Sequence, residues 1–435
     1  MKEGIIEREL VDELNKKHAV VRVGRFYVLT EDVDILGNPT FSLEGRSSFR
    51  QFYENKSFVG SDGRPHNVAD VWLRSTNRRE YSGITFDPGL SPDETKYNLW
   101  NGFAFKPRKG DCSKFWAHVF DNICNKNEVE YLYLRKWIAS VFQKPEEVHT
   151  GVVLCGSQGT GKNSFVNPLG ELFGSHFIEL SGLNELLSDF NFHLKNAVLI
   201  HANEALWSNS KHGIGRLKAM ITDRLCTIEA KGRDRTVLRN YKHVIISSNE
   251  HFPIHLDSDD RRFFVLRVSD AKKEDHAYFE AIKKQLDNGG YEALLYDILN
   301  EDISSYNPRI FPWSNESFKI KLMSTDSCTR YIYECLFSGF LDINSSFKWS
   351  QIISRKFIYA HYKQWCRENG EPVMTGNIFG VFLKKIFPTI GTTRLSESNG
   401  TRTYAYKLFP LSFARSEFSK YFKSSLVDIF PFKSK

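Results

Sequence analysis

The stretch GSQGTGKN, residues 156–163, most constrains how this chain of 435 residues can fold. It follows the apolar run TGVVLCG, which is typical of a strand buried in a parallel sheet. Glycines at such a turn let backbone N–H groups converge on an anion at the start of a helix. A lysine in the turn then reaches the β- and γ-phosphates. The stretch therefore predicts a nucleotide-binding loop between a strand and a helix.

The loop departs from the usual phosphate-binding pattern at one position. The pattern G-x-x-x-x-G-K is normally followed by Ser or Thr, which helps to hold Mg²⁺, whereas this chain has Asn163. An amide oxygen could face the metal instead, directly or through a water, while Ser164 is expected to point elsewhere on the helix. We predict that these residues contact nucleotide: Gly156, Ser157, Gln158, Gly159, Thr160, Gly161, Lys162, Asn163 and Ser164.

Apolar strands and helical stretches alternate after the loop. The runs HFIEL, NAVLIHA, HVIISSN and RFFVLRV read as further strands. This pattern predicts an α/β fold with a parallel sheet flanked by helices over residues 149–270. We expect an α+β region over 1–105, which is a collar or a dock for a partner, and a helical segment over 106–148. A connector is expected over 271–320, followed by a last domain over 321–435.

The last domain is basic. Its 115 residues carry 17 Lys and Arg against 8 Asp and Glu, although the net charge of the whole chain is only +7. Two helix-like stretches precede TTRLSESNGTRTYAYKLF, which reads as a hairpin. This order predicts a winged-helix-like module that binds DNA, and a solvated basic surface is the alternative. The residues expected to contact DNA here are Lys384, Lys385, Arg394 and Arg402.

Two later strands end in polar residues that suit nucleotide hydrolysis. The run AVLIHANEAL places Asn203 and Glu204 where an Asp would hold Mg²⁺ and a Glu would orient the attacking water. Glu204 is the predicted catalytic base, with a plain surface carboxylate as the alternative, and Asn203 is a neutral amide at the metal position. HVIISSN ends in Asn249, which we expect beside the γ-phosphate.

Arginines before the last strand could act on a neighbouring subunit. In DSDDRRFFVL, Arg261 or Arg262 could stabilise the γ-phosphate of the next subunit as a finger. We favour Arg261, although the sequence does not separate the two. Salt bridges to Asp257, Asp259 or Asp260 are the alternative.

A basic turn lies between the second and third motifs. The stretch IEAKGRDRTVLRN reads as a hairpin whose tip holds Lys231, Gly232, Arg233 and Arg235. Such a tip could reach into a central pore and grip a DNA backbone. A solvated hairpin tip is the alternative.

The ordered set of motifs resembles superfamily 3 AAA+ helicases, which are P-loop NTPases. The matching stretches are GSQGTGKN, VLIHANEAL, EAKGRD, VIISSN and DDRRFFVL. The chain is similar, in particular, to the helicase region of phage and plasmid primase-helicases and to the C-terminal part of a deep-sea vent phage primase-polymerase. This narrower likeness begins near residue 70 and includes YNLWNGFAFKPRKGDC, YLYLRKWIASVFQKP and YKQWCRENG.

The resemblance implies a ring, usually a hexamer, with ATP and Mg²⁺ bound between subunits. It implies 3′-to-5′ movement on single-stranded or forked DNA during replication, beside a primase-polymerase domain or protein. Sequences of this type usually have Ser or Thr at position 163 and Asp at position 203. The two amides leave a working motor and a nucleotide-bound DNA clamp both open. The predicted catalytic residues are Lys162, Glu204, Asn249, Arg261 and Arg262.

Other function classes fit the sequence less well. A small-molecule kinase would leave the basic last domain unexplained. The start MKEGIIEREL has no signal-peptide core, and no apolar run reaches the length of a membrane span. We therefore expect a cytoplasmic protein, in the host cytoplasm if it is phage-encoded.

Overall fold

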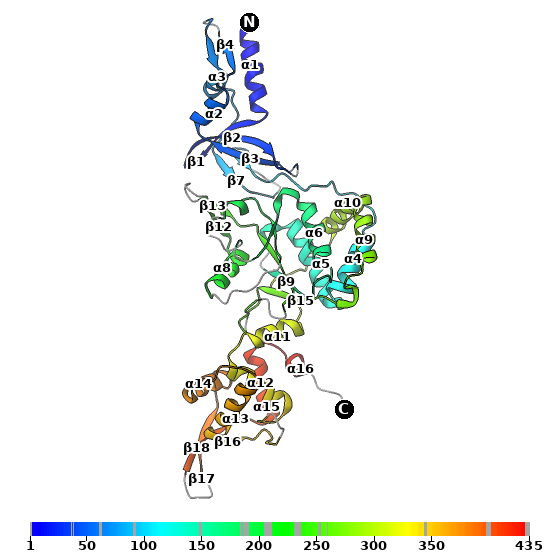
Figure 1. Cartoon of the computed structure of the whole chain (residues 1–435), viewed down its shortest axis with the longest axis vertical. Helices are drawn as coiled ribbons and strands as arrows, with labels where there is room; N and C mark the ends of the chain where they lie inside the picture. The colour runs from blue at the N-terminus through cyan, green and yellow to red at the C-terminus, as the bar shows by residue number, and fades with distance from the viewer. Residues whose placement is uncertain are drawn as a thin grey trace.

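The computed structural model forms three successive parts, from the N-terminal part through a central α/β part to the C-terminal part (Figure 1). No helix among the residues that the structure describes is long and apolar enough to cross a bilayer. The structure describes residues 2–35, 37, 39–60, 63–89, 93–147, 150–182, 185, 191–203, 211–229, 236–250, 254–258, 260–342, 346–396 and 402–430.

The N-terminal part is a small α+β unit built on a sheet of order β3-β2-β1-β6. The predicted hairpin is confirmed, because β1 and β2 pair in antiparallel fashion around Gly24, whose φ is +68°. Phe49 and Trp72 come from two helices and pack with Val20 and Val28 in one buried cluster. The elements are α1 (Lys2–Asn15), β1 (His18–Val23), β2 (Arg25–Val33), β3 (Pro39–Glu44), α2 (Arg46–Phe52), β4 (Ser57–Val59), β5 (Pro65–Asn67), α3 (Val68–Arg74), β6 (Glu80–Tyr81), β7 (Gly83–Thr85) and β8 (Lys96–Asn98).

The central part contains the predicted parallel sheet. Its strand order is β10-β11-β14-β9-β15, and every neighbouring pair is parallel. Because the strands are parallel, their carboxyl ends share one edge of the sheet, where ligands bind in open α/β folds. The strands are β9 (Gly151–Cys155), β10 (Phe177–Leu180), β11 (Leu199–Ala202), β14 (His243–Ser248) and β15 (Phe263–Arg267).

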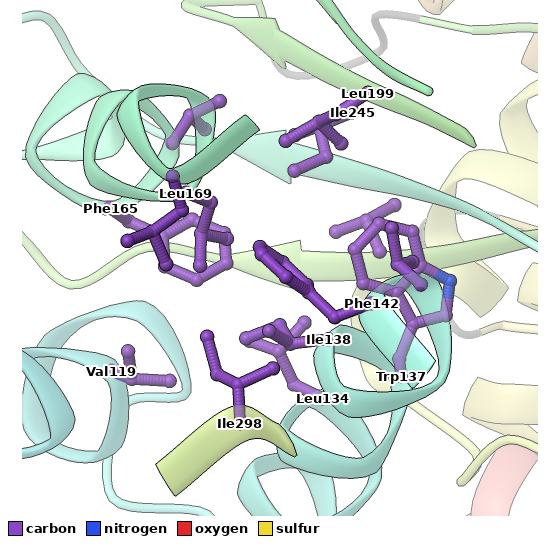
Figure 2. Close-up of a cluster of buried hydrophobic side chains, with 14 of the residues drawn as sticks. Val119, Leu134, Trp137, Ile138, Phe142, Phe165, Leu169, Leu199, Ile245 and Ile298 are labelled. Carbon is purple, nitrogen blue, oxygen red and sulfur yellow. The ribbon is translucent and has the colours of Figure 1, made fainter. Parts of the chain in front are cut away.

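Helices cover both faces of this sheet and bury its apolar side chains. Figure 2 shows side chains of α5, such as Trp137 and Phe142, packed with Phe165 of α6 and with Ile245 of the sheet. Truncating a buried ring of this kind typically costs about 3–5 kcal/mol, so these contacts fix α6 against the sheet. The helices and remaining strands are α4 (Ser113–His118), α5 (Glu128–Gln143), α6 (Lys162–Phe173), α8 (Lys211–Thr222), β12 (Leu225–Ile228), β13 (Thr236–Arg239), α9 (His276–Gln285) and α10 (Tyr291–Asn300).

The helices that follow β15 pack back onto the central part. Ala293, Leu294 and Ile298 of α10 are buried in the same cluster as Leu134 of α5. Asp275 caps α9 by accepting a hydrogen bond from the N–H of Tyr278. The segment predicted as a polar connector thus contributes part of the core beside α4 and α5.

The C-terminal part combines helices with a three-stranded antiparallel sheet of order β16-β18-β17. The two predicted helices and the predicted hairpin are present, in the order expected. A buried aromatic cluster that includes Tyr362, Trp365 and Phe379 holds these helices together. The elements are α11 (Asn315–Met323), α12 (Ser327–Ser338), β16 (Ile352–Ser354), α13 (Arg355–Glu368), α14 (Gly376–Ile386), β17 (Gly391–Ser396), β18 (Arg402–Lys407), α15 (Leu411–Tyr421) and α16 (Leu426–Ile429).

Candidate nucleotide-binding site

The Gly-rich loop joins β9 to α6 at the carboxyl edge of the sheet. Gly161 caps the helix in the left-handed conformation, with φ +89°. A Cβ there would lie 2.5 Å from the Phe279 ring and 2.8 Å from the His118 ring. Only glycine fits both the backbone angle and the space. The loop is therefore built to bring backbone N–H groups together at the start of α6.

Lys162 lies within the loop, with a buried side chain. Its ammonium donates hydrogen bonds to the carbonyl oxygens of Gly156 and Ser157, at 2.6 and 2.9 Å. It also donates to the amide oxygen of Asn249, at 2.8 Å. These neutral acceptors hold the charge over the loop, so the structure brings together the cation and the polar strand end that the sequence singled out.

A short helical segment outside the sheet supports the loop from behind. His118 Nε2 lies 3.0 Å from the carbonyl oxygen of Gly161, and Asn122 Nδ2 donates to the carbonyl oxygen of Thr160 at 2.6 Å. Both side chains are almost fully buried. The carbonyls of Thr160 and Gly161 therefore turn toward this segment, which leaves the N–H groups at the start of α6 for a ligand.

His118 is held in one neutral form. Because a carbonyl can only accept, Nε2 carries the proton, and Nδ1 accepts from the hydroxyl of Tyr278 at 3.2 Å. Burial lowers the pKa of His118 to about 4, although the hydrogen bond to Gly161 opposes this effect. The histidine is thus uncharged at neutral pH and acts on the loop by position alone.

The segment after β15 contributes a second support. The backbone N–H of Glu274 donates to the carbonyl oxygen of Gly159 at 3.0 Å. The ring of Phe279 in α9 packs against Gly161 and fills the position that a Cβ on this residue would need. Sequence reasoning missed His118, Asn122, Glu274 and Phe279, because each reads locally as an ordinary helix or turn residue.

The end of β11 places Asn203 beside a carboxylate from the neighbouring strand. Asn203 Nδ2 lies 3.2 Å from Glu179 Oε1 of β10. A carboxylate can only accept hydrogen bonds, so Asn203 must present its NH₂ group to Glu179. Its amide oxygen is the atom that remains for the nucleotide side. Sequence reasoning also missed Glu179, which precedes the last residue of an apolar strand and gave no motif.

A buried histidine lies beneath Asn203. His201 Nε2 is 2.8 Å from Ser247 Oγ of β14, and Nδ1 is 3.4 Å from Glu179 Oε1. Burial lowers the pKa of His201 to about 4, so the ring is neutral and its approach to Glu179 is no ion pair at neutral pH. These contacts link the carboxyl ends of three adjacent strands.

The first turn of α6 exposes the residue that replaces the usual hydroxyl. Asn163 is exposed and Ser164 is half-buried. Of the remaining loop residues, Gln158 is exposed, whereas Thr160 is buried and donates to the carbonyl oxygen of Ser157. Asn163, directly after Lys162, thus offers an accessible amide oxygen as a ligand for a metal ion.

Arg261 and Arg262 lie at the amino ends of the strands, whereas the Gly-rich loop of the same chain lies at their carboxyl ends. The carbonyl oxygen of Arg262 accepts from the N–H of Gly151, the first residue of β9. At about 3.3 Å per residue, the five residues of β9 separate this point from the loop by roughly 15 Å. Arg261 is exposed. Such an arginine is better placed to meet another subunit than its own loop.

Of the three carboxylates named as alternative partners of the arginines, Asp257 and Asp260 already have a partner, and Asp259 lies outside the described residues. Asp260 is buried and lies 2.7 Å from the ammonium of Lys218, whereas the guanidinium of Arg262 lies 3.9 Å away. Lys218 also binds Asp257, at 2.6 Å. Arg261 makes no ion pair with any residue that the structure describes.

Some predicted residues lie outside the described residues. Glu204 is one of them. The strands of the predicted basic hairpin are described, and β12 and β13 pair in antiparallel fashion. The tip of that hairpin is not. The other predicted residues outside the described part are therefore Lys231, Gly232, Arg233 and Arg235.

The four basic residues of the C-terminal part that were predicted to contact DNA are exposed on α14, β17 and β18. Lys384 and Lys385 lie in the last turn of α14. Arg394 lies opposite Tyr404 in the β17–β18 hairpin and donates to its hydroxyl at 3.1 Å. Arg402 follows on the same face, because it is two residues from Tyr404. Sequence reasoning missed Tyr404, whose ring is 55% exposed beside these cations.

Comparisons with known proteins match two segments and much of the fold. Residues 154–262 match a family of unknown function, DUF5906, and residues 339–411 match the RFX DNA-binding domain. A curated relative, the DNA primase-polymerase of Nitratiruptor phage NrS-1, is 28% identical over 231 residues. That match covers 50% of this chain and 32% of the relative.

Solved structures of the NrS-1 C-terminal region share the fold. An apo structure matches with a TM-score of 0.66 and 18% identity, covering 92% of this chain and 98% of that chain. A second apo form matches with a TM-score of 0.66 and 19% identity. The predicted likeness to the C-terminal part of a phage primase-polymerase is therefore confirmed.

Proposed function

We propose that this chain, a relative of a phage DNA primase-polymerase, is an ATP-driven ring translocase or helicase that acts on single-stranded DNA during phage or plasmid replication. The observation that carries the proposal is the contact between Lys162 and Asn249. It joins a glycine-capped loop to the end of β14, where a sensor of the γ-phosphate is needed. The same edge of the sheet holds Asn203 at the end of β11.

The loop fits a nucleoside triphosphate. Lys162 donates hydrogen bonds to neutral oxygens of Gly156, Ser157 and Asn249. Phosphate oxygens carry negative charge and form shorter, stronger hydrogen bonds to an ammonium than neutral oxygens do. A bound phosphate would therefore displace these acceptors, with backbone N–H groups at the start of α6 completing its coordination.

The residues around the loop also fit Mg²⁺, with a reduced protein contribution. Asn163 and Asn203 offer neutral amide oxygens instead of a hydroxyl and a carboxylate. Mg²⁺ tolerates this arrangement because it keeps several waters and binds substrate phosphates directly. The metal would neutralise charge on the phosphates, while Lys162 and Asn249 hold the γ-phosphate and Glu204 orients the water.

The ring and the DNA contacts rest on separate observations. Arg261 lies exposed at the edge opposite its own loop, as a finger for the next subunit would. The C-terminal part supplies exposed Lys384, Lys385, Arg394 and Arg402 within a stretch similar to the RFX DNA-binding domain. A primase-polymerase domain or protein is the expected partner, by analogy with the NrS-1 relative.

Steady-state ATP hydrolysis with Mg²⁺, with and without single-stranded DNA, tests the proposal. DNA-stimulated turnover that Glu204→Gln abolishes is the expected result, because the Gln keeps the size of the side chain but cannot take a proton. Turnover that persists in Glu204→Gln would remove this residue as the base. No binding of ATP to the wild-type chain would overturn the nucleotide site itself.

A nucleotide-bound DNA clamp is the second candidate. Both residues expected in the Mg²⁺ shell, Asn163 and Asn203, are amides, which favours binding over hydrolysis. Tight ATP binding with turnover no greater than that of Glu204→Gln would support the clamp and rule out the motor.

A further inference from the structure

A pocket in the N-terminal part lies apart from the site described above. It has a volume of about 460 Å³ and lies between the β1–β2 hairpin and helices α2 and α3, which Figure 1 shows together near the N-terminus. Arg46, Arg74 and Arg78 line it with Phe26 and Tyr27 and three aliphatic side chains. We propose that this pocket binds single-stranded nucleic acid, with phosphate on the arginines and a base on Phe26.

The charge of the pocket is positive. No carboxylate is among the described residues that line it. Arg74 is exposed and makes no ion pair with the described residues. Arg46 has only a 3.5 Å contact with Asp70, which Arg50 already holds at 2.9 Å. Two of the three guanidinium groups are therefore available to an anionic ligand.

The third arginine is already neutralised. Arg78 binds Glu80 at 3.0 Å and also donates to the carbonyl oxygen of Leu73. Arg22 adds another cation at the mouth of the pocket, because it pairs with Phe26 across the hairpin and directly opposed residues point to the same face. Arg22 is exposed, and it too lacks an ion pair with any described residue.

Phe26 gives the pocket an aromatic platform. Phe26 is 71% exposed, although Val20 and Val28 on the same face of the sheet are buried beneath α2 and α3. The hairpin thus extends beyond the helices and carries this ring into solvent. An exposed ring beside Arg22 and Arg74, which make no ion pair with the described residues, suits a nucleotide, because a base stacks on the ring while the guanidinium groups hold phosphate.

Stacking selects a single strand over a duplex. Bases in a duplex are already stacked on each other, whereas bases of a single strand can turn onto a protein ring. DNA and RNA share this chemistry. The proposed site needs neither ATP nor the loop at Gly161, so it goes beyond the proposed function.

Binding of fluorescein-labelled oligothymidylate and oligouridylate to the 435-residue chain, without nucleotide, tests the proposal. Arg74→Glu should weaken binding about tenfold and make the salt dependence less steep by about 0.7 per lost phosphate contact. The matched control is Arg8→Glu, which makes the same charge change on an exposed position of α1 outside the pocket. Equal effects of the two variants, or none, would overturn the proposal.

Two substitutions at Phe26 separate stacking from simple apolar contact. Phe26→Leu should weaken binding several-fold, whereas Phe26→Trp should retain it, because only the second keeps an aromatic face. A leucine variant that binds like wild type would overturn the assignment of the base to this ring. Equal loss of duplex binding in Arg74→Glu would overturn the selection of a single strand.

The folding and nucleotide site of each variant are checked by its melting temperature and ATP affinity. Both should match wild type, because the pocket lies in a different part of the fold from Lys162. If ATP is hydrolysed normally while Arg74→Glu binds single strands like wild type, the inference fails and the proposed function stands. If single-strand binding falls as expected in a chain without hydrolysis, the proposed function fails and the inference stands.

Discussion

The amide oxygen of Asn249 lies 2.8 Å from the ammonium of Lys162, although the two residues are 87 positions apart in the chain. The contact forms because β14 lies next to β9 in the sheet. Lys162 starts the helix that follows β9, and Asn249 follows the last residue of β14. One neutral oxygen thus holds the cation that a γ-phosphate would need.

Asn249→Asp should weaken ATP binding by about tenfold or more. The new carboxylate would form an ion pair with Lys162 where the amide oxygen now accepts a hydrogen bond, and a phosphate would then have to displace a charged group at this position. Asn249→Ala is the matched control, because it removes the amide without adding charge. It should weaken binding less than Asn249→Asp does, while slowing any hydrolysis.

Isothermal titration calorimetry with ATP distinguishes the two Asn249 variants. If Asp and Ala at this position alter the affinity equally, Asn249 does not govern the charge balance around Lys162. The sensor role would then have to be assigned elsewhere.

Gly161→Ala should destabilise the central part by about 3 kcal/mol. A left-handed conformation costs a non-glycine residue about 1–2 kcal/mol, and the new methyl group would overlap the rings of Phe279 and His118. Gly182→Ala is the control, since a Cβ at that position meets nothing within 4 Å. Chemical denaturation should show the loss in the first variant only.

The neutral form of His118 makes stability depend on pH. Its pKa of about 4 in the folded chain lies below the value of about 6.5 for an exposed histidine. The unfolded chain therefore binds more protons between pH 6.5 and 4, so the free energy of unfolding falls as pH falls through this window. The contribution of His118 to this loss is roughly 2 kcal/mol at pH 5.

His118→Gln isolates this effect. Glutamine can still donate to the carbonyl oxygen of Gly161 but does not titrate, so its melting temperature should fall less between pH 7 and pH 5 than that of wild type. Buried His201 titrates in both proteins and cancels in the comparison. Identical pH dependence in the two proteins would mean that the His118 ring is not held neutral by the fold.

The contact between Asn203 and Glu179 predicts that an Asp would be unfavourable at position 203. An aspartate there would place two carboxylates about 3.2 Å apart and remove a hydrogen-bond donor. Asn203→Asp should therefore lower the melting temperature at neutral pH by roughly 2 °C. Glu179→Gln combined with Asn203→Asp should restore it, because the new amide can donate to the new carboxylate.

The same double variant tests the metal site. It moves the negative charge from β10 to the end of β11, and ATP binding should then need less Mg²⁺ than in wild type. The measurement is ATP affinity against Mg²⁺ concentration. Additive effects of the two single substitutions would show that the side chains do not interact.

The parallel sheet could be predicted from the sequence because each strand is a short apolar run bounded by polar turns. The loop could be predicted because its glycines and Lys162 are local in sequence. His118 and Asn122 could not, because they reach the loop only through the packing of α4 and the following π-helical segment (Val119–Ile123) against α6. Glu179 was missed for the same reason, since strand pairing alone brings it to Asn203.

Arg261 should act in trans if the chain forms a ring. Arg261→Ala removes an exposed cation that makes no ion pair with the described residues. It should therefore abolish DNA-stimulated turnover while leaving ATP binding and the melting temperature intact. Arg262→Ala is the control, because the guanidinium of Arg262 lies 3.9 Å from the carboxylate of Asp260 and is expected to act within its own subunit.

Mixing two inactive variants tests this geometry directly. Lys162→Ala lacks a working loop but keeps Arg261, whereas Arg261→Ala keeps the loop. In a mixed ring, some interfaces pair an intact loop with an intact arginine, so turnover should partly return. In a monomer, or if Arg261 serves its own loop, every site lacks one of the two residues and mixing restores nothing. The roughly 15 Å length of β9 between Arg262 and the loop favours the first outcome.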